Sequence, residues 1–285
     1  SADLLEKLAI DSQTNGVRKT TGICEKRAIS NDEQGNAIYS DTPNPDKAWR
    51  LSDSLLLNIE TRDVFHTSFP HDFSILVTFK AEYVKYFNLI SIYSREGVVQ
   101  LSFTISDNIT FSWRDNSETT ASTRNSLLTA TFTSRIKDNE WHRLAVSCKG
   151  DSITLLTDCN TQQTKPFLRR KDSSLDLSGV TFVGQSTNAT KNFDGIIQQL
   201  FVIPTSEAAY EQCVDYIPDC ESPFPYEDVI FTEPTTFYDN ANSETKPSTE
   251  EISETFTKNT TTVITSSTDN YNFTEIPVFP DVRFI

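Results

Sequence analysis

The most concentrated positive charge in the sequence lies in residues 165–171, which read KPFLRRK. Lys165, Arg169, Arg170 and Lys171 place four cations within this short segment. Such a cluster attracts a sulfated glycan such as heparan sulfate even on an acidic protein, because salt confines the competing charges to a range of about 8 Å. A solvated surface loop has the same composition. The sequence therefore leaves two interpretations open, a glycan contact and an ordinary loop.

The three histidines offer little for catalysis. His142 lies within an alternating stretch, and His66 and His71 flank a Phe-Pro pair near the start of another. A lone histidine in such a place is far more often a packed or exposed side chain than a general base. The sequence also lacks the G-x-S-x-G, H-E-x-x-H and glycine-rich phosphate-loop motifs. We therefore expect no enzymatic activity and no cofactor.

The acidic residues do not form a recognisable metal site. Asp63, Asp107 and Asp115 are available near predicted loops, but isolated loop acids are usually solvated, so we predict no metal ligand. The net charge of −15 argues against nucleic acid as a partner, because phosphate binding needs a basic face. No apolar run approaches the roughly 18 residues that span a membrane. The absence of methionine favours a mature product of signal removal or a fragment.

The sequence contains five cysteines, an odd number that leaves one without an intrachain partner. None is spaced C-x-x-C, so a zinc knuckle is not expected. Four Asn-x-Ser/Thr motifs fit a secreted chain and predict N-glycosylation. The cysteines are Cys24, Cys148, Cys159, Cys213 and Cys220, and the motifs begin at Asn108, Asn188, Asn259 and Asn272.

Residues 141–159 have the pattern of a β-hairpin. Leu144, Val146 and Cys148 alternate with Arg143, Ala145 and Ser147, which predicts a strand with one buried face. Lys149-Gly150-Asp151 has the composition of a hairpin turn, and a second alternating stretch follows it. Cys148 at the turn and Cys159 at the open end are then about 27 Å apart, from eight residues of about 3.4 Å each. These two cysteines therefore cannot bond to each other.

Further short strands are predicted around this hairpin at residues 48–51, 73–80, 88–93, 98–104, 109–113, 128–133, 180–183 and 196–203. Many short strands with little helix predict an all-β antiparallel sandwich. Residues 1–19 are predicted to be an N-terminal segment, in which a short helix within residues 1–10 packs on the rim of the sandwich. From residue 221 to 285 the chain has 12 acidic and 3 basic residues, and 19 of its 65 residues are Ser or Thr. This composition predicts a disordered acidic arm.

Residues 138–146, DNEWHRLAV, resemble the D-G-x-W-H strand of laminin-G-like domains, in particular the thrombospondin-N-terminal-like branch. The resemblance runs over residues 24–220 and is densest at 20–24, 69–76, 141–159, 193–200 and 208–220. In order and spacing these segments are similar to the amino-terminal propeptide of type V/XI fibrillar collagen α chains. Asn139 stands where that domain usually has glycine, and Cys148 is an additional cysteine.

The resemblance implies a laminin-G-like jelly roll over residues 20–220. It also implies two disulfides, Cys24–Cys220 and Cys159–Cys213, which leaves Cys148 as a thiol. The implied function is a secreted, non-enzymatic module of the extracellular matrix. It would be the N-terminal non-collagenous region of a fibrillar collagen chain that helps to regulate fibril assembly and diameter. Its partners would be other collagen chains and fibrils.

The alternative is a heparan-sulfate- or receptor-binding module of a thrombospondin-like secreted protein. Gly-X-Y repeats after Ile285 would discriminate between the two. A lectin-like sugar site is a third idea that the fold by itself does not establish.

Overall fold

The computed structural model describes residues 1–225 except residues 12, 82–85, 116–125, 134–135, 137 and 186–191. The glycosylation predictions at Asn188, Asn259 and Asn272 lie outside the described residues, as does nearly all of the predicted arm. The first 231 residues belong to one structural unit.

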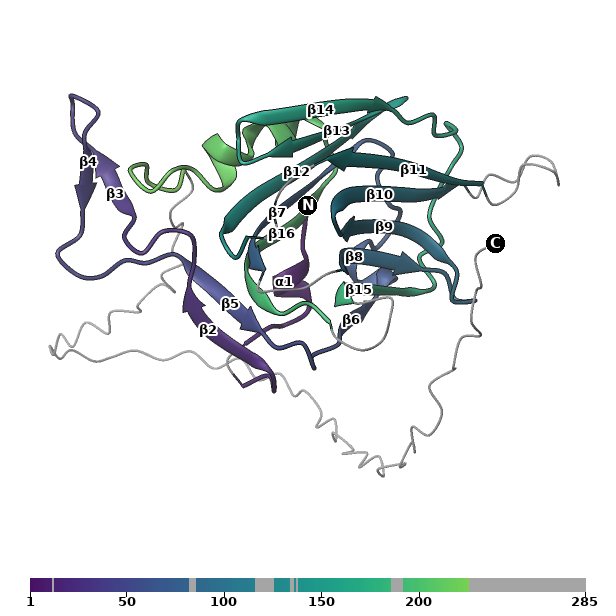
Figure 1. The fold of residues 1–285 in the computed structure, drawn as a ribbon, viewed down its shortest axis with the longest axis horizontal. Coiled ribbons are helices and arrows are strands. Elements are labelled where there is room, and N and C mark those ends of the chain that lie inside the picture. Colours follow the sequence, from purple (N-terminus) through teal and green to yellow (C-terminus); the bar gives the residue numbers. More distant parts are fainter. Residues whose placement is uncertain are drawn as a thin grey trace, which may run out of the picture. The chain divides into compact units, whose positions relative to one another are not determined.

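Among the described residues, eight strands form the larger of the two main antiparallel sheets (Figure 1). Seven follow the order β14-β13-β12-β7-β16-β5-β2, and β1 also pairs with β16. The strands of this larger sheet are β1 (Ala2–Asp3), β2 (Val17–Thr21), β5 (Lys47–Leu51), β7 (Phe73–Ala81), β12 (Trp141–Lys149), β13 (Ser152–Thr157), β14 (Thr161–Pro166) and β16 (Gly195–Ile203). The predicted hairpin is therefore confirmed as β12–β13, and its first strand lies beside β7 near the middle of the sheet.

The smaller sheet has six strands in the order β11-β10-β9-β8-β15-β6. Its strands are β6 (Leu57–Glu60), β8 (Phe87–Tyr93), β9 (Val99–Ile105), β10 (Asn108–Asp115), β11 (Ser126–Thr133) and β15 (Val180–Gln185). The short helix α2 (Thr61–Val64) follows β6 directly. The two sheets confirm the predicted all-β antiparallel sandwich.

Aromatic side chains from both sheets fill the space between them. Phe73 and Phe79, on the predicted inner face of β7, are fully buried. The ring centroid of Phe73 is 6.1 Å from those of both Phe111 and Trp113 on β10, and Phe79 lies 6.2 Å from Phe87 on β8. Each fully buried side chain of this size stabilises the fold by about 1.5–3 kcal/mol, so alternation on β7 largely specifies the core.

A helical segment covers part of the outer face of the larger sheet. It consists of the 3-10 helix η1 (Glu207–Glu211) and the π-helix η2 (Gln212–Tyr216). Ala208 and Ala209 pack against Leu76 and Ala145 in a second apolar cluster. The alternation in β12 predicts one buried face, whereas both Ala145 and Ser147 on its other face are buried. That prediction is wrong for the middle of β12, because the helical segment supplies a third layer.

The first residues of the chain pack against the sandwich. β1 pairs with β16, and the one-turn helix α1 (Leu4–Lys7) follows it. The Asp3 carboxylate caps this helix by accepting from the Leu5 and Glu6 N–H groups at 2.9 and 3.2 Å. Leu4 is fully buried in the main core. Leu5 is buried as well, whereas Glu6 and Lys7 are exposed, so the short helix packs on the sandwich through one side, and the domain boundary at residue 20 stays a prediction.

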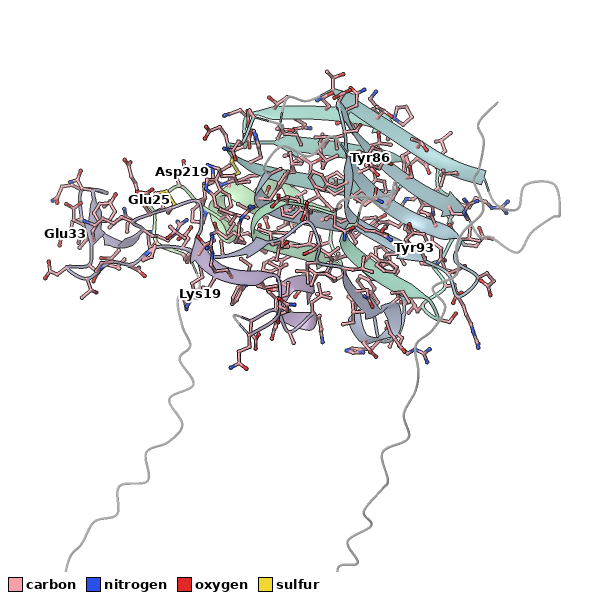
Figure 2. The ribbon with its side chains drawn as sticks, turned by 60° about the horizontal axis from the view of Figure 1, so that its bottom comes forward. Lys19, Glu25, Glu33, Tyr86, Tyr93 and Asp219 are labelled. Carbon is pink, nitrogen blue, oxygen red and sulfur yellow. A yellow bond between two sulfur atoms is a disulfide. The ribbon has the colours of Figure 1, made fainter. Side chains whose placement is uncertain are left out.

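One hairpin projects from the sandwich (Figures 1 and 2). It comprises β3 (Ala28–Asn31) and β4 (Ala37–Tyr39), which pair only with each other. Glu33 lies in the turn at its far end, Glu25 lies just before its first strand, and Lys19 belongs to β2 of the larger sheet (Figure 2). The sequence did not indicate this hairpin, because its residues lack clear alternation. Among the described residues no helix is long and apolar enough to cross a membrane.

Candidate functional site

Three cations occupy matching positions on three strands of the larger sheet. Arg18 on β2 lies opposite Arg50 on β5. Arg50 lies opposite Ile196 on β16, which in turn lies opposite Lys80 on β7. Lys80 lies opposite Trp141 on β12. Residues that are directly opposite across strands share a face, so these five side chains form one line across the sheet.

This line points away from the core. Neighbouring positions on the same strands, such as Val17, Leu51 and Phe79, are buried in the core, and successive side chains of a strand point to opposite faces. Arg18 is exposed, while Arg50 and Lys80 are half-buried. We call Arg18, Arg50 and Lys80 the cationic row. With strands about 4.8 Å apart, the four steps from β2 to β12 cover about 19 Å.

A surface hollow of about 370 Å³ lies at the β2–β5 end of the cationic row. It is lined by Gly16, Val17, Arg18, Arg50, Leu51, Ser52 and Asp194. Arg50 forms an ion pair with Asp194 at 2.9 Å. This carboxylate offsets one of the three positive charges, so the row and Asp194 together carry a net charge of +2.

The hollow and the row together suit an extended polyanion. Guanidinium groups bind sulfate-like oxygens through paired N–H donors, and the lysine adds a point charge. Trp141 at the far end is half-buried, so this aromatic residue is partly accessible beside Lys80. The local positive charge acts despite the net charge of −15, because salt screens distant acids beyond about 8 Å.

Only part of the predicted basic cluster at residues 165–171 is accessible to a glycan at the surface. Arg169 has a fully buried side chain and forms an ion pair with Asp72 at 3.4 Å. Its guanidinium also donates to the His71 carbonyl oxygen and lies over the rings of Phe73 and Trp113 at 5.6 and 5.4 Å. The assignment of Arg169 to a glycan site is therefore wrong, because this side chain is committed to the interior.

The remaining cations of that cluster stay a glycan-contact prediction. Lys165 on β14 and Lys171 are exposed. Arg170 is half-buried and forms an ion pair with Asp172 at 3.3 Å. Proximity in sequence did not place the four cations on one surface. The cationic row was missed because its members lie far apart in sequence and meet only through the strand register.

The two disulfides connect the pairs that the resemblance implies. Cys24 is joined to Cys220 and Cys159 to Cys213, with Cα atoms 5.5 and 6.0 Å apart. Cys148 is free and fully buried. Burial raises the pKa of its thiol to about 12, so this cysteine is a packed apolar side chain.

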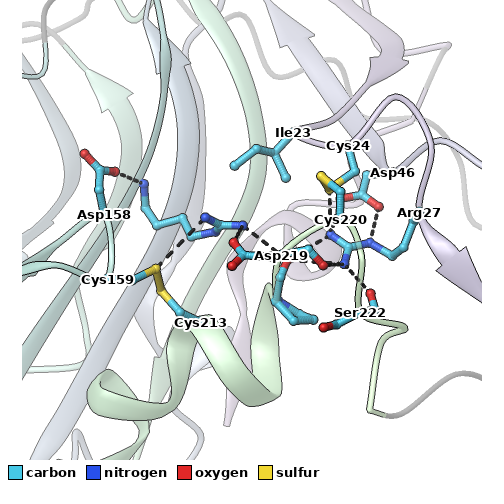
Figure 3. Close-up of polar contacts among 12 residues, drawn as sticks. Ile23, Cys24, Arg27, Asp46, Asp158, Cys159, Cys213, Asp219, Cys220 and Ser222 are labelled. Carbon is cyan, nitrogen blue, oxygen red and sulfur yellow. Dashed lines mark hydrogen bonds and ion pairs between the residues drawn. A yellow bond between two sulfur atoms is a disulfide. The ribbon is translucent and has the colours of Figure 1, made fainter. Parts of the chain in front are cut away.

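A buried arginine fastens the C-terminal end of the sandwich to the base of the projecting hairpin (Figure 3). Arg27 makes a two-point ion pair with Asp46, at 2.6 Å from Nε and 2.8 Å from Nη2. Its guanidinium also donates to the carbonyl oxygens of Pro218, Asp219 and Ser222. Both Arg27 and Asp46 have side chains that are only 1% exposed. We call these contacts, together with the adjacent Cys24–Cys220 disulfide, the arginine lock.

His142 has a structural position. Its Nδ1 lies 2.9 Å from the Asp158 carboxylate and its Nε2 lies 2.9 Å from the Asp138 carboxylate. Burial alone would lower the pKa of His142, but the two hydrogen bonds outweigh burial and raise it above 6.5. Both ring nitrogens donate only when the ring carries two protons. The imidazolium therefore ties the start of β12 to the end of β13.

The acidic side chains and the glycosylation motif that the sequence singled out do not form part of this site. Within the described ranges, no group of three or more His, Cys, Asp or Glu side chains is placed to hold a metal ion. The side chain of Asp115 lies outside the described residues. Asn108 is exposed at the start of β10, and its glycosylation stays a prediction.

Comparison with known proteins supports the fold and gives a coarse functional class. Residues 87–203 match the model of the laminin G domain, so the sandwich is laminin-G-like. A collagen alpha-1(XXVII) chain of Rattus norvegicus is 30% identical over 79 residues, which are 27% of this chain and 4% of the collagen. A collagen alpha-1(XXIV) chain of Homo sapiens is 26% identical over 84 residues, 30% of this chain and 5% of the collagen. The matched segments are thus a small part of either collagen, and the similarity is weaker than a specific type V/XI assignment requires.

Two of the solved structures that match do so at low scores. Domains LG4-5 of the mouse laminin alpha1 chain match at a TM-score of 0.40 and 18% identity, covering 57% of this chain and 46% of that one. A sialidase carbohydrate-binding module of Ruminococcus gnavus matches at a TM-score of 0.38 and 11% identity, covering 66% of this chain and 92% of that one. At these scores neither likeness carries an argument about function.

Proposed function

We propose that this protein is a non-enzymatic module of the extracellular matrix that binds sulfated glycosaminoglycans of the heparan sulfate type. The observation that carries the proposal is the cationic row, which lines up three cations on one face beside a hollow. The laminin G match and the collagen similarity favour a matrix setting, in which sulfated glycans are abundant ligands.

The row suits a linear sulfated polymer better than a small anion. Arg18 and Arg50 are one strand apart, and Lys80 is two strands further, so the three charges are spread over about 14 Å. A polymer with sulfates at regular intervals contacts all three at once, whereas a single sulfate reaches one end. Asp194 holds Arg50 in place until an anionic ligand competes for its guanidinium.

Heparin chromatography with matched variants tests this proposal. An Arg18→Ala/Lys80→Ala variant should elute at a clearly lower salt concentration than the wild type, because two of the three cations are gone. The control is Lys165→Ala/Lys171→Ala, which removes the same charge from the exposed part of the loop cluster. Equal elution of the row variant and the wild type would contradict the proposal. Weaker heparin binding in the control variant alone would show that the glycan site lies in the loop cluster and not in the cationic row.

A second candidate function rests on the collagen similarity. In it the protein is the N-terminal non-collagenous region of a fibrillar collagen and limits fibril diameter by its volume and negative charge. The parent transcript should then continue into Gly-X-Y repeats after Ile285. Electron microscopy of fibrils formed with and without residues 1–285 should show wider fibrils in their absence, and unchanged diameters would reject the role.

A further inference from the structure

Asn15-Gly16 is the one Asn-Gly dipeptide in the sequence, and it lies in the turn that leads into β2. The Val17 N–H donates to the Thr14 carbonyl oxygen at 3.0 Å, which closes the turn. Gly16 has a φ of +85°, a conformation that glycine adopts without strain. Asn15 is exposed. The turn therefore presents an asparagine side chain beside a backbone nitrogen that no Cβ shields.

We propose that Asn15 is a site of spontaneous deamidation, and that the product weakens glycan binding by the cationic row. The second half rests on the function proposed above, whereas the first does not. In the first step the Gly16 backbone nitrogen attacks the amide carbon of the Asn15 side chain. A new bond between these two atoms closes a five-membered succinimide, the bond from that carbon to the Asn15 Nδ2 breaks, and ammonia leaves with the Gly16 amide proton. Water then opens the ring to aspartate or isoaspartate.

The turn is placed so that this change reaches the row. Gly16 lines the same hollow as Arg18 and Arg50, so deamidation adds a negative charge at the residue directly before the lining of this hollow. The Ser52 N–H also donates to the Gly16 carbonyl oxygen at 3.0 Å. Isoaspartate adds one carbon to the backbone just before β2, which disturbs this bond and the pairing of Arg18 with Arg50.

Asp194-Gly195 provides an internal comparison at the same hollow. An Asp-Gly pair can close the same ring, but Gly195 is fixed in β16 between Leu51 and Ala81. A Cβ at Gly195 would collide with the Lys80 carbonyl oxygen, which shows how tightly this backbone is packed. We therefore expect reaction at Asn15 and none at Asp194.

Peptide mapping of the whole protein after prolonged incubation at neutral pH and body temperature tests the chemistry. The peptide that contains Asn15 should gain one mass unit, and isoaspartate should be detected there by enzymatic methyl transfer. The peptide that contains Asp194 should show no isoaspartate. Asn36 serves as the comparison asparagine, because it is also exposed but is followed by Ala37 and not by a glycine. Retention of the Asn15 amide throughout the incubation, or faster loss at Asn36, would overturn the proposal.

Heparin binding of unaged variants tests the consequence. Asn15→Asp should bind about 1.5-fold to fivefold more weakly than the wild type, the range of one exposed charge contact. The matched control is Gln162→Glu on β14, at the opposite edge of the same sheet, which should bind like the wild type. Asn15→Gln should resist the loss of affinity on ageing.

The outcomes separate the two halves of the proposal. If the wild type does not bind heparin at low salt, the glycan function and the effect on binding both fall, while the mass change still decides the deamidation. If Asn15→Asp and Gln162→Glu both bind like the wild type, the link between Asn15 and the row is wrong.

Discussion

Replacing Arg27 with methionine tests whether the arginine lock stabilises the sandwich. Methionine keeps much of the side-chain volume but removes the charge and every donor. Asp46, with a side chain only 1% exposed, then loses its cationic partner. The hydrogen bond from Gln198 to the Asp46 carboxylate, at 2.9 Å, would remain.

The expected cost follows from the burial of the pair. Breaking a buried ion pair by removing one partner typically costs about 3–5 kcal/mol, because the remaining charge is left uncompensated. For a unit of this size each kcal/mol lowers Tm by about 2–4 °C, so Arg27→Met should melt about 6–20 °C below the wild type. The Cys24–Cys220 disulfide keeps the two ends connected, so we expect a destabilised fold and not an unfolded protein.

Thermal unfolding by circular dichroism, with urea titrations beside it, measures the effect. Lys26→Met is the matched control: Lys26 is exposed and lies 4.5 Å from the Tyr39 ring centroid, a contact of no more than about 1 kcal/mol. An Arg27→Met/Asp46→Leu variant should recover most of the loss, because no buried charge remains. A free energy of unfolding of Arg27→Met within about 1 kcal/mol of the wild-type value would show that the arginine lock does not stabilise the sandwich. A double variant no more stable than the single one would show that the contacts of Arg27 with the backbone carbonyl oxygens carry the effect.

Two further predictions concern buried titratable groups. Folding raises the pKa of His142 above its ordinary 6.5. The contribution of His142 to the free energy of unfolding is therefore fully present below pH 6.5 and is lost as the pH rises through the folded pKa. Urea unfolding over a pH series should show this loss, and the pH dependence should disappear in His142→Gln. With its pKa raised to about 12 by burial, Cys148 should resist alkylation in the native protein and react fully in denaturant, and rapid labelling of the native thiol would contradict its buried position.

The sequence predicted the sandwich well because alternation is a local property. In β7 and β12 every second residue faces the same core, so Phe73, Phe79 and Leu144 could be assigned to it without knowledge of their partners. The strands that were missed are those without this pattern. β14 is exposed along nearly its whole length, and β3 has only one buried residue. Their pairing comes from neighbouring backbone and not from an apolar face.

The candidate site was much less predictable because it depends on register. The sequence indicated a basic cluster from neighbours in sequence, and the fold directs Arg169 into the interior. Arg18, Arg50 and Lys80 are spread over more than 60 residues of sequence, and each alone is an ordinary surface cation. Only the pairings across β2, β5, β16 and β7 bring them into line. Shifting β2 by one residue would turn Arg18 to the opposite face.

The arginine lock and the cationic row are connected through β2, which is an edge strand and pairs only with β5 within the described sheet. An edge strand with one neighbour is prone to fraying, yet β2 is held at both ends. The Thr14–Val17 turn fixes its start, and the Gly22 N–H donates to the Asp46 carbonyl oxygen at 2.8 Å just beyond its end. Asp46 is the partner of Arg27, so the lock fixes the end of the strand that carries Arg18. Holding the cation in place before a ligand arrives lowers the entropic cost of binding. We therefore expect Arg27→Met to weaken heparin binding even at temperatures where the sandwich remains folded. Binding equal to that of the wild type under those conditions would show that β2 keeps its register without the lock.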